Sequence, residues 1–411
     1  MQTRPATPLD LLSSLAGLIA LPLLTLYLAI ALTYYDGALI FPDFAFFSHL
    51  SLPTPRVLGL YLGWFALQGT LAALLPGRKV FGVALADGRA LPYTLNGWRA
   101  FVVTLGIVGV AVATGVLPPT LLHDQLVPLL VTANLFSFAL CAYIFVLGRA
   151  QATPEEKLPG LIQSFFLGSA LNPRNGDFDW KFFCESRPGM ILWVLIDLSM
   201  AAAQYQRHGT VSTSMALVCL FQAFYVADYF WLEEAILTTW DIRHEPFGFM
   251  LCWGCLVWIP FTFSLQSVYL VDHAFALPLW ATAALVAFNF AGYYIFRSSN
   301  LQKHRFRSDP TRPIWGRTPD FIATARGTRL LVAGWWGIAR HANYLGDLMM
   351  GLAWCLTTGF SRFIPYFYIT YFVILLVHRE RRDYDHCAAK YGADWQEYAR
   401  RVRWRIVPGV Y

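Results

Sequence analysis

The sequence contains few charged residues. Of its 411 residues, 14% are charged and 57% are hydrophobic, whereas roughly a quarter of the residues in a soluble globular domain are charged. Uncharged runs of Leu, Ala, Val and Phe recur along the chain, and a run of about 20 apolar residues spans a bilayer core of about 30 Å. An ordinary soluble protein is therefore excluded. The composition predicts an all-α, polytopic integral membrane protein with one membrane domain over residues 1–411.

The common nucleotide-binding and secreted-protein signatures are also absent. No two of the 30 glycines stand two positions apart, so a G-x-G-x-x-G fingerprint is missing, and G-x-x-x-x-G-K-[ST] is missing as well. The seven cysteines are scattered, and Cys252 and Cys255 have C-x-x-C spacing without a neighbouring His. We therefore expect no disulfide framework and no metal. Any dinucleotide must be bound by membrane helices and the loops between them.

Ten hydrophobic segments are long enough to be predicted as membrane spans. The fifth is short and the ninth is interrupted by polar residues. They cover approximately residues 9–33, 57–75, 100–117, 127–147, 189–205, 211–237, 248–270, 275–296, 331–359 and 363–377.

Positive charge is distributed unequally around these ten spans. With a cytosolic N-terminus, only Arg56, Arg207 and Arg362 of the 31 Lys and Arg residues lie on the far side, as the positive-inside rule requires. Both termini are therefore predicted to be cytosolic. The host membrane would be the endoplasmic reticulum in a eukaryote, or the inner or intracytoplasmic membrane in a bacterium. Basic clusters beside membrane spans favour lipid headgroups or an anionic cofactor, and we expect no nucleic-acid partner.

Two basic clusters flank the interrupted ninth span, near residues 297–312 and 379–405. Guanidinium groups bind phosphate oxygens in pairs, so the two clusters could hold a pyrophosphate and a further phosphate. The positive-inside effect is the alternative explanation for any single Arg. It does not account for the aromatic and polar residues interleaved with the charges, which are Trp336, His341, Asn343, Tyr344, Asp383, Tyr391, Trp395 and Tyr398.

A second polar group lies in the middle of the chain. Tyr225 and Asp228 are three residues apart and so share one face of a helix. Desolvation in an apolar cavity favours the neutral form of a carboxyl group, which makes this pair a candidate proton donor. The alternative is that Asp228, Glu233 and Glu234 pair with basic groups and stabilise helix packing.

Seven motifs in order resemble the sterol reductase family, which includes delta-14-sterol reductases, 7-dehydrocholesterol reductases and the membrane part of the lamin B receptor. The resemblance covers most of the chain, and each motif alone is weak. The motifs are Leu75-Pro76-Gly77, Asp87-Gly88 with Tyr93 to Gly97, Leu171 to Arg174 with Asp179 to Gly189, Tyr225 to Phe249, Asn300 to Lys303, Trp335 to Asp347, and His378 to Asp383 with Lys390-Tyr391-Gly392.

This resemblance implies an NADPH-dependent oxidoreductase that reduces a sterol carbon–carbon double bond, most similar to the delta-14 enzymes. Its implied partners are a sterol substrate and membrane lipids. Residues 1–205 would form N-terminal helices, and 206–411 would bind sterol and NADPH. The implied proton donors are Tyr225 and Asp228, with Asp241, His244 and Glu234 in reserve. The implied cofactor contacts are Arg297, Asn300, Lys303, Arg307, Trp336, His341, Asn343, Tyr344, Asp347, Arg379, Asp383, Lys390, Tyr391 and Tyr398.

Two other functions fit parts of the sequence. The pattern Arg340-His341-x-x-Tyr344-x-Gly346, followed by Arg379-Glu380 and Tyr391-Gly392-x-x-Trp395-x-x-Tyr398, also resembles isoprenylcysteine carboxyl methyltransferases, which bind S-adenosylmethionine. That resemblance is confined to the C-terminal part of the chain. A non-catalytic sterol-binding scaffold is the third alternative.

Overall fold

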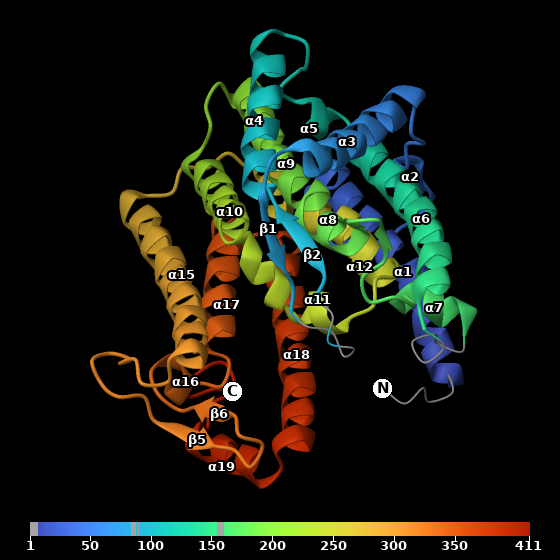
Figure 1. Ribbon diagram of the computed structural model, residues 1–411. Helices are drawn as coiled ribbons and strands as arrows, with labels where there is room; N and C mark the ends of the chain where they lie inside the picture. Colours follow the sequence, from blue (N-terminus) through green and yellow to red (C-terminus); the bar gives the residue numbers. More distant parts are fainter. Residues whose placement is uncertain (1–6, 84–87, 89, 154–159) are drawn as a thin grey trace. The chain divides into compact units, whose positions relative to one another are not determined.

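The computed structural model describes residues 7–83, 88, 90–153 and 160–411 and is shown in Figure 1. In these residues the secondary structure is helical apart from three two-stranded hairpins. Asp87 of the second motif lies outside the described residues. The chain divides into two compact units, an N-terminal unit of residues 1–275 with 362–364 and a C-terminal unit of residues 276–361 with 365–411.

The N-terminal unit contains most of the helices. Its elements are α1 (Pro8–Tyr34), α2 (Phe44–Ser48), α3 (Pro55–Leu74), β1 (Arg78–Phe81), β2 (Pro92–Leu95), α4 (Gly97–Ala113), α5 (Leu121–Asp124), α6 (Leu126–Gln151), α7 (Leu161–Leu167), β3 (Arg174–Asn175), β4 (Phe178–Asp179), α8 (Trp180–Ser186), α9 (Pro188–His208), α10 (Thr213–Trp231), η1 (Glu233–Thr238), α11 (Trp240–His244), α12 (Phe249–Trp253), η2 (Gly254–Trp258), α13 (Ile259–Thr262) and α14 (Leu265–Leu270).

The C-terminal unit is built on three longer helices and a compact polar end. Its elements are α15 (Leu279–Ser308), β5 (Phe321–Ala323), β6 (Arg329–Leu331), α16 (Trp335–Ile338), α17 (Ala342–Leu356), η3 (Ile364–Tyr366), α18 (Phe367–Tyr391) and α19 (Ala393–Arg401).

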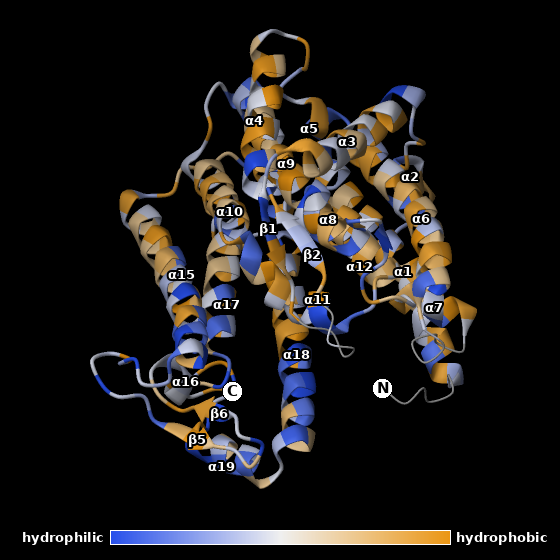
Figure 2. Ribbon diagram, viewed as in Figure 1, coloured by the Kyte–Doolittle hydropathy of each residue, from blue (hydrophilic) through white to orange (hydrophobic). Residues whose placement is uncertain are grey.

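Seven helical segments in the described residues are long and apolar enough to cross a membrane. They confirm the predicted all-α, polytopic membrane class. Helix α4 is also apolar but has only 17 residues, and Figure 2 shows α18 changing from hydrophobic to hydrophilic along its length. The count of ten spans stays a prediction. The seven segments are Pro8–Tyr34, Pro55–Leu74, Leu126–Gln151, Trp180–His208, Thr213–Trp231, Phe249–Leu270 and Leu279–Ser308.

Local sequence signals set several helix ends. Thr7 accepts a hydrogen bond from the backbone of Asp10, whose side chain in turn bonds to the Thr7 backbone, so α1 begins with a capping box. Ser212 caps α10 in the simpler way, by accepting from the backbone N–H of Met215. Gly209 ends α9 in the left-handed conformation at a φ of 72°. These caps provide hydrogen-bond partners for backbone groups at the helix ends, which the apolar interior of a membrane cannot supply.

The central sequence motif forms the junction between α8 and α9. Pro188 is the first residue of α9, where its missing N–H costs no hydrogen bond. Gly189 then allows the helix to approach the wide π turn η2, because a Cβ at this position would lie 1.8 Å from the backbone oxygen of Cys255. The junction therefore depends on backbone-to-backbone packing that only glycine permits.

In the C-terminal unit, α15 and α17 pack through a matched pair of glycines. A Cβ added to Gly346 would lie 2.5 Å from the Gly292 oxygen, and one added to Gly292 would lie 2.7 Å from the Gly346 oxygen. Small residues allow such close contact between membrane helices. The tail joins the same unit, since the Arg340 N–H donates to the backbone oxygen of Trp404 and the His341 N–H to that of Arg405, both at 2.9 Å.

We expect Gly189→Ala to destabilise the protein by about 1–3 kcal/mol or more, the usual cost of overpacking. The added Cβ would collide with the backbone oxygen of Cys255, so backbone atoms must move. The matched control is Gly106→Ala in α4, where an added Cβ meets nothing within 4 Å. Thermal unfolding of both variants in detergent tests the expectation. Equal unfolding temperatures for the two variants would contradict it.

Candidate functional site

All of the predicted cofactor residues lie in the C-terminal unit. Helix periodicity places those of α15 on one face, because they are spaced by three or four residues. The remaining residues come from α16, the start of α17, α18 and α19. In chain order they are Arg297, Asn300, Lys303 and Arg307; Trp336; His341, Asn343, Tyr344 and Asp347; Arg379, Asp383, Lys390 and Tyr391; and Tyr398.

Five of these residues form the centre of the cluster. The Lys303 ammonium group lies 3.9 Å from the centroid of the Trp336 ring, a cation–π contact. The Nε2 atom of His341 lies 3.6 Å from Oδ2 of Asp383, and the His341 ring stacks on Tyr344 with centroids 4.7 Å apart. Lys303 acts electrostatically on both His341 and Asp383. Residues distant in the sequence thus converge on one polar centre.

Burial governs the electrostatics of this centre. Desolvation raises the pKa of the Asp383 carboxyl, and the positive charge of Lys303 partly offsets this effect. Burial also raises the pKa of the Tyr398 phenol, which Arg340 opposes. The surrounding charge is mainly positive. An anionic ligand would therefore gain more from this centre than a cationic one.

Two further pairs extend the cluster along the helices. Asn343 Nδ2 donates to Asn300 Oδ1 at 3.3 Å, which links α17 to α15. The charge of Arg379 acts on the Asp347 carboxyl, which links α18 to α17. The first pair leaves Oδ1 of Asn343 buried and without a hydrogen-bond partner in the described part of the chain.

Other predicted residues contact mainly aromatic rings. Arg297 lies over the rings of Tyr293 and Phe296 at 5.9 and 5.8 Å, and Lys390 lies 5.0 Å from the centroid of Tyr391. Tyr391 and Tyr398 belong to a hydrophobic cluster with Ile322, Trp395 and Val402. For these tyrosines the structure adds a packing role to the predicted contact with a cofactor.

Arg340 belongs to this cluster, although the sequence analysis did not select it as a cofactor contact. Its side chain is 7% exposed, and its guanidinium carbon lies 5.3 Å from the ring centroid of Tyr384. Neither Nε nor Nη1 has a hydrogen-bond partner among the described residues. The available signal was its place beside His341 in an otherwise apolar stretch. A buried cation with unpaired donors suits an anionic ligand.

The predicted proton donors lie in the N-terminal unit, on two helices. Tyr225 and Asp228 share one face of α10, and the Tyr225 ring lies 6.1 Å from that of Trp193. Asp241 and His244 are on the short helix α11. His244 is exposed and lines a hollow of about 230 Å³ with Tyr93, Asn172 and Arg243 among its walls.

A buried lysine holds the α11 segment in place. The Nζ atom of Lys181 donates to the backbone oxygens of Leu171, Ile242 and Glu245 at 3.1, 3.0 and 2.8 Å. These three acceptors use all three ammonium protons, and Asp241 adds its charge nearby. The lysine of the central motif therefore positions the loop that carries Asp241 and His244.

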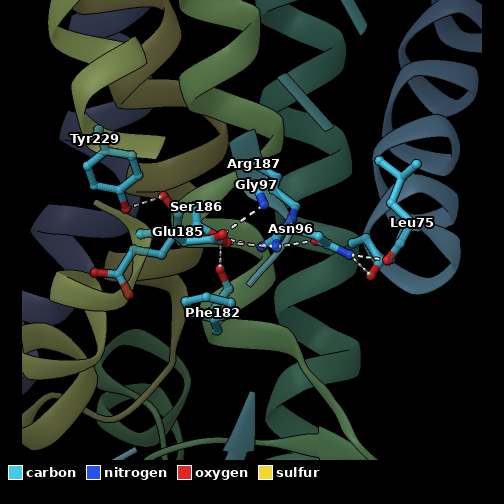
Figure 3. A network of polar contacts seen from close by, with 10 residues as sticks. Leu75, Asn96, Gly97, Phe182, Glu185, Ser186, Arg187 and Tyr229 are labelled. Carbon is cyan, nitrogen blue, oxygen red and sulfur yellow. Dashed lines mark hydrogen bonds and ion pairs between the residues drawn. The ribbon is translucent and has the colours of Figure 1, made fainter. Parts of the chain in front are cut away.

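A second buried network, drawn in Figure 3, connects motifs distant in the sequence. Arg187 Nη2 donates to Asn96 Oδ1 at 2.6 Å and to Glu233 Oε1 at 2.8 Å. The other oxygen of Glu233 accepts from the Gly97 N–H at 2.8 Å. Asn96 in turn donates to the backbone oxygens of Ala72 and Leu75. The network fixes the ends of α3, α4 and α10 against the start of α9.

Comparison with known proteins identifies the family. Residues 17–411 match the model of the ergosterol biosynthesis ERG4/ERG24 family. The chain belongs to this family. It is 52% identical to "Delta(14)-sterol reductase" of Methylotuvimicrobium alcaliphilum, with 97% of this chain and 95% of the relative covered. It is 43% identical to the protein of that name from Dictyostelium discoideum (87% and 79% covered) and 41% identical to that from Arabidopsis thaliana (88% and 97% covered).

Membership of the ERG4/ERG24 family confirms the resemblance drawn from the seven motifs. The relatives' names also confirm the predicted enzyme class, an oxidoreductase of sterol double bonds, for the family. The match includes the central motifs, which the methyltransferase resemblance does not cover. The motifs of this family coincide with buried contacts: Asn96, Lys181, Arg187 and Glu233 each make them.

Two of the three central acids pair with basic groups, as the alternative interpretation predicted; whether these pairs stabilise the packing of the helices stays a prediction. Glu233 forms the buried ion pair with Arg187, and Glu234 forms an exposed ion pair with Arg78. Tyr229 and Glu185 lie within the sequence motifs, but the sequence analysis did not select either as a site residue. The Tyr229 hydroxyl donates to the backbone oxygen of Glu185 at 3.3 Å, and the charge of Glu185 acts on this phenol. Their spacing from Tyr225 and Lys181, one helical turn each, was the available signal.

We expect Glu233→Gln to destabilise the protein by about 3–5 kcal/mol, because it leaves the buried Arg187 charge without its partner. The matched control is Glu234→Gln, which removes an exposed ion pair worth less than about 1 kcal/mol. Thermal unfolding in detergent compares the two. Similar losses would show that the buried pair contributes no more than the exposed one.

Proposed function

We propose that this protein reduces the delta-14 double bond of a sterol, with NADPH as the hydride donor. The polar centre of the C-terminal unit carries the cofactor part of the proposal. The relatives' names support the reaction. The substrate would enter from the membrane, which is the natural solvent for a sterol.

The residues of the C-terminal unit suit a phosphorylated dinucleotide. Lys303, Arg307 and Arg379 supply cationic donors for phosphate oxygens, and guanidinium groups bind such oxygens bidentately. The unpaired Nε and Nη1 atoms of Arg340 and the unpaired Oδ1 atom of Asn343, as far as the described residues extend, are further groups that a ligand would satisfy. Amide oxygens such as Asn343 Oδ1 accept from amide donors, and the nicotinamide carries one.

The chemistry requires a proton as well as a hydride. An isolated alkene is a poor hydride acceptor, so a protein acid must first protonate one carbon of the double bond. The neighbouring carbon becomes a tertiary cation, which the hydride then quenches. NADPH supplies that hydride when bound. The reaction consumes one proton and one hydride, and solvent returns the proton to the acid.

Tyr225 and Asp228 are the proposed acid. Both are half-buried on one face of α10, and the Tyr225 ring lies beside the indole of Trp193. The proton donor and the hydride must reach the same bond with water excluded, so that the cation is not trapped by water. Asp241 and His244 are the reserve donors.

The cofactor contact is tested by Arg379→Ala. We expect NADPH binding to weaken about ten- to a hundredfold, because a charge-assisted contact worth roughly 1.5–3 kcal/mol is lost. Arg381→Ala is the matched control, since Arg381 is exposed on the same helix. Calorimetric titration with NADPH and with S-adenosylmethionine measures both. Unchanged NADPH affinity in folded Arg379→Ala would remove this residue from the site, and tighter binding of S-adenosylmethionine would favour methyl transfer.

The proton donor is tested by Tyr225→Phe and Asp228→Asn. Both changes preserve shape, so NADPH binding should persist while single-turnover reduction slows about a hundred- to ten-thousandfold, the usual contribution of general acid catalysis. Tyr205→Phe, at a 59% exposed position of α9, is the matched control. Deuterium from solvent should label one carbon and deuterium from the nicotinamide its neighbour. Near-normal rates in both variants would transfer the role to Asp241 or His244.

A further inference from the structure

The two faces of the C-terminal part of α15 carry different chemistry. Asn300, Lys303 and Arg307 point toward the polar centre described above. Ser298, Gln302 and Arg305 follow the same spacing but are displaced by about half a turn, so they lie on the opposite face. The basic cluster that the sequence presents as one group is therefore divided between two separate places.

On this opposite face the structure has an open hollow of about 210 Å³. Its walls are α15 and the loop that follows it. The volume is below the roughly 300 Å³ of a pocket for a drug-sized ligand, so it suits a small group rather than a whole lipid or a dinucleotide. The lining residues are Tyr294, Ser298, Leu301, Gln302, Arg305, Phe306, Arg312, Pro313, Ile314 and Trp315.

The hollow presents unpaired hydrogen-bond donors. Arg305 and Arg312 line the hollow and are exposed, and within the described chain their guanidinium groups form neither a hydrogen bond nor an ion pair. Asp309, the acid whose charge interacts with Arg312, accepts hydrogen bonds from the backbone N–H and hydroxyl of Thr311. Gln302 Oε1 accepts a hydrogen bond from the backbone N–H of Trp335 at 3.0 Å. The NH₂ end of the Gln302 amide therefore stays available to donate to a ligand.

Aromatic residues form the other side of the hollow. Trp315 is 56% exposed and Tyr294 is 61% exposed, and the rings of both lie edge-on to Trp335. Trp315 has a φ of 51°, in a two-residue turn with Gly316 at 76°. Such turns favour Asn-Gly. The backbone of a tryptophan in the left-handed region is strained. The turn nevertheless keeps the indole of Trp315 exposed.

The position of the hollow along α15 indicates its ligand. Helix α15 is one of the apolar, membrane-long helices, and it ends at Ser308. Figure 2 shows its hydrophobic part giving way to hydrophilic residues toward this end. Exposed Phe290, Tyr294 and Leu301 continue on the face that leads into the hollow. Tryptophan, tyrosine and arginine at the end of a membrane helix are located at headgroup level.

We propose that this hollow binds the phosphate headgroup of an anionic phospholipid. Arg305, Arg312 and the Gln302 amide bind the phosphate oxygens. Trp315 and Tyr294 pack against the glycerol and upper acyl carbons, as aromatic residues do at membrane interfaces. Because α15 also carries Lys303 and Arg307, a bound lipid would anchor the helix that forms part of the polar centre. This site is separate from the proposed cofactor contacts and does not depend on the proposed reaction.

The test is native mass spectrometry of the full chain after reconstitution with phosphatidylcholine and phosphatidylglycerol. We expect retained phosphatidylglycerol, and at least about tenfold weaker retention in the double variant Arg305→Gln, Arg312→Gln. The matched control is Arg317→Gln, which removes a basic residue from the same loop outside the hollow and should retain the lipid. The double lysine variant, which keeps both charges, should retain part of the preference.

Three outcomes would overturn the proposal. Equal retention of phosphatidylglycerol in the double glutamine variant would place the lipid elsewhere, and equal retention of phosphatidylcholine would exclude recognition of an anionic headgroup. Displacement of the lipid by a millimolar excess of inorganic phosphate would assign the hollow to a soluble phosphate compound. Unfolding temperatures of all variants establish that each comparison is made on folded protein.

Discussion

The structure depends on one constraint, which is that a charge buried among apolar helices must be paired or fully hydrogen-bonded. Arg187 and Glu233 show it most clearly, at 2% and 5% side-chain exposure. Several of their contacts hold helix ends, including the N–H of Gly97 at the start of α4 and, through Asn96, the last residues of α3. Lys181 obeys the same rule with three backbone oxygens. In this chain, several polar residues of the sequence motifs thus hold the loops between the membrane helices in place.

The same constraint distinguishes structural charges from those available to a ligand. Both carboxylate oxygens of Glu233 accept hydrogen bonds within the fold, from Arg187 and from the Gly97 N–H. Oε2 of Glu380 accepts from Arg405 at 2.9 Å and from the Tyr411 hydroxyl at 3.1 Å, whereas its Oε1 is unpaired among the described residues. Arg340 lies in the same region and keeps two donor atoms unpaired among the residues described. Leaving such donors unpaired is costly unless a ligand completes them. The unpaired buried atoms of Arg340 and Asn343, together with the density of basic residues, distinguish the polar centre of the C-terminal unit.

Helix periodicity separates further roles on a single element. On α15, the Lys303 ammonium group lies over the Trp336 ring, whereas Arg305 lines the hollow together with Trp315. Residues two positions apart on a helix point in nearly opposite directions. One helix can therefore present a cofactor-directed face and a lipid-directed face without mixing their charges.

The sequence by itself determined the membrane class, the positions of the apolar helices and the family motifs, because apolar length and motif order are local properties of the chain. It also indicated that Lys303, His341 and Asp383 belong to one site, through the family resemblance. Only the tertiary structure decided which acids are already paired, as Glu233 and Glu234 are, and which basic residues share a face. It also revealed the buried, unpaired donors of Arg340 and the hydrogen bonds of Lys181 and Tyr229. The physical reason is that pairing and burial are set by residues from other helices, at distances that no spacing along the chain encodes.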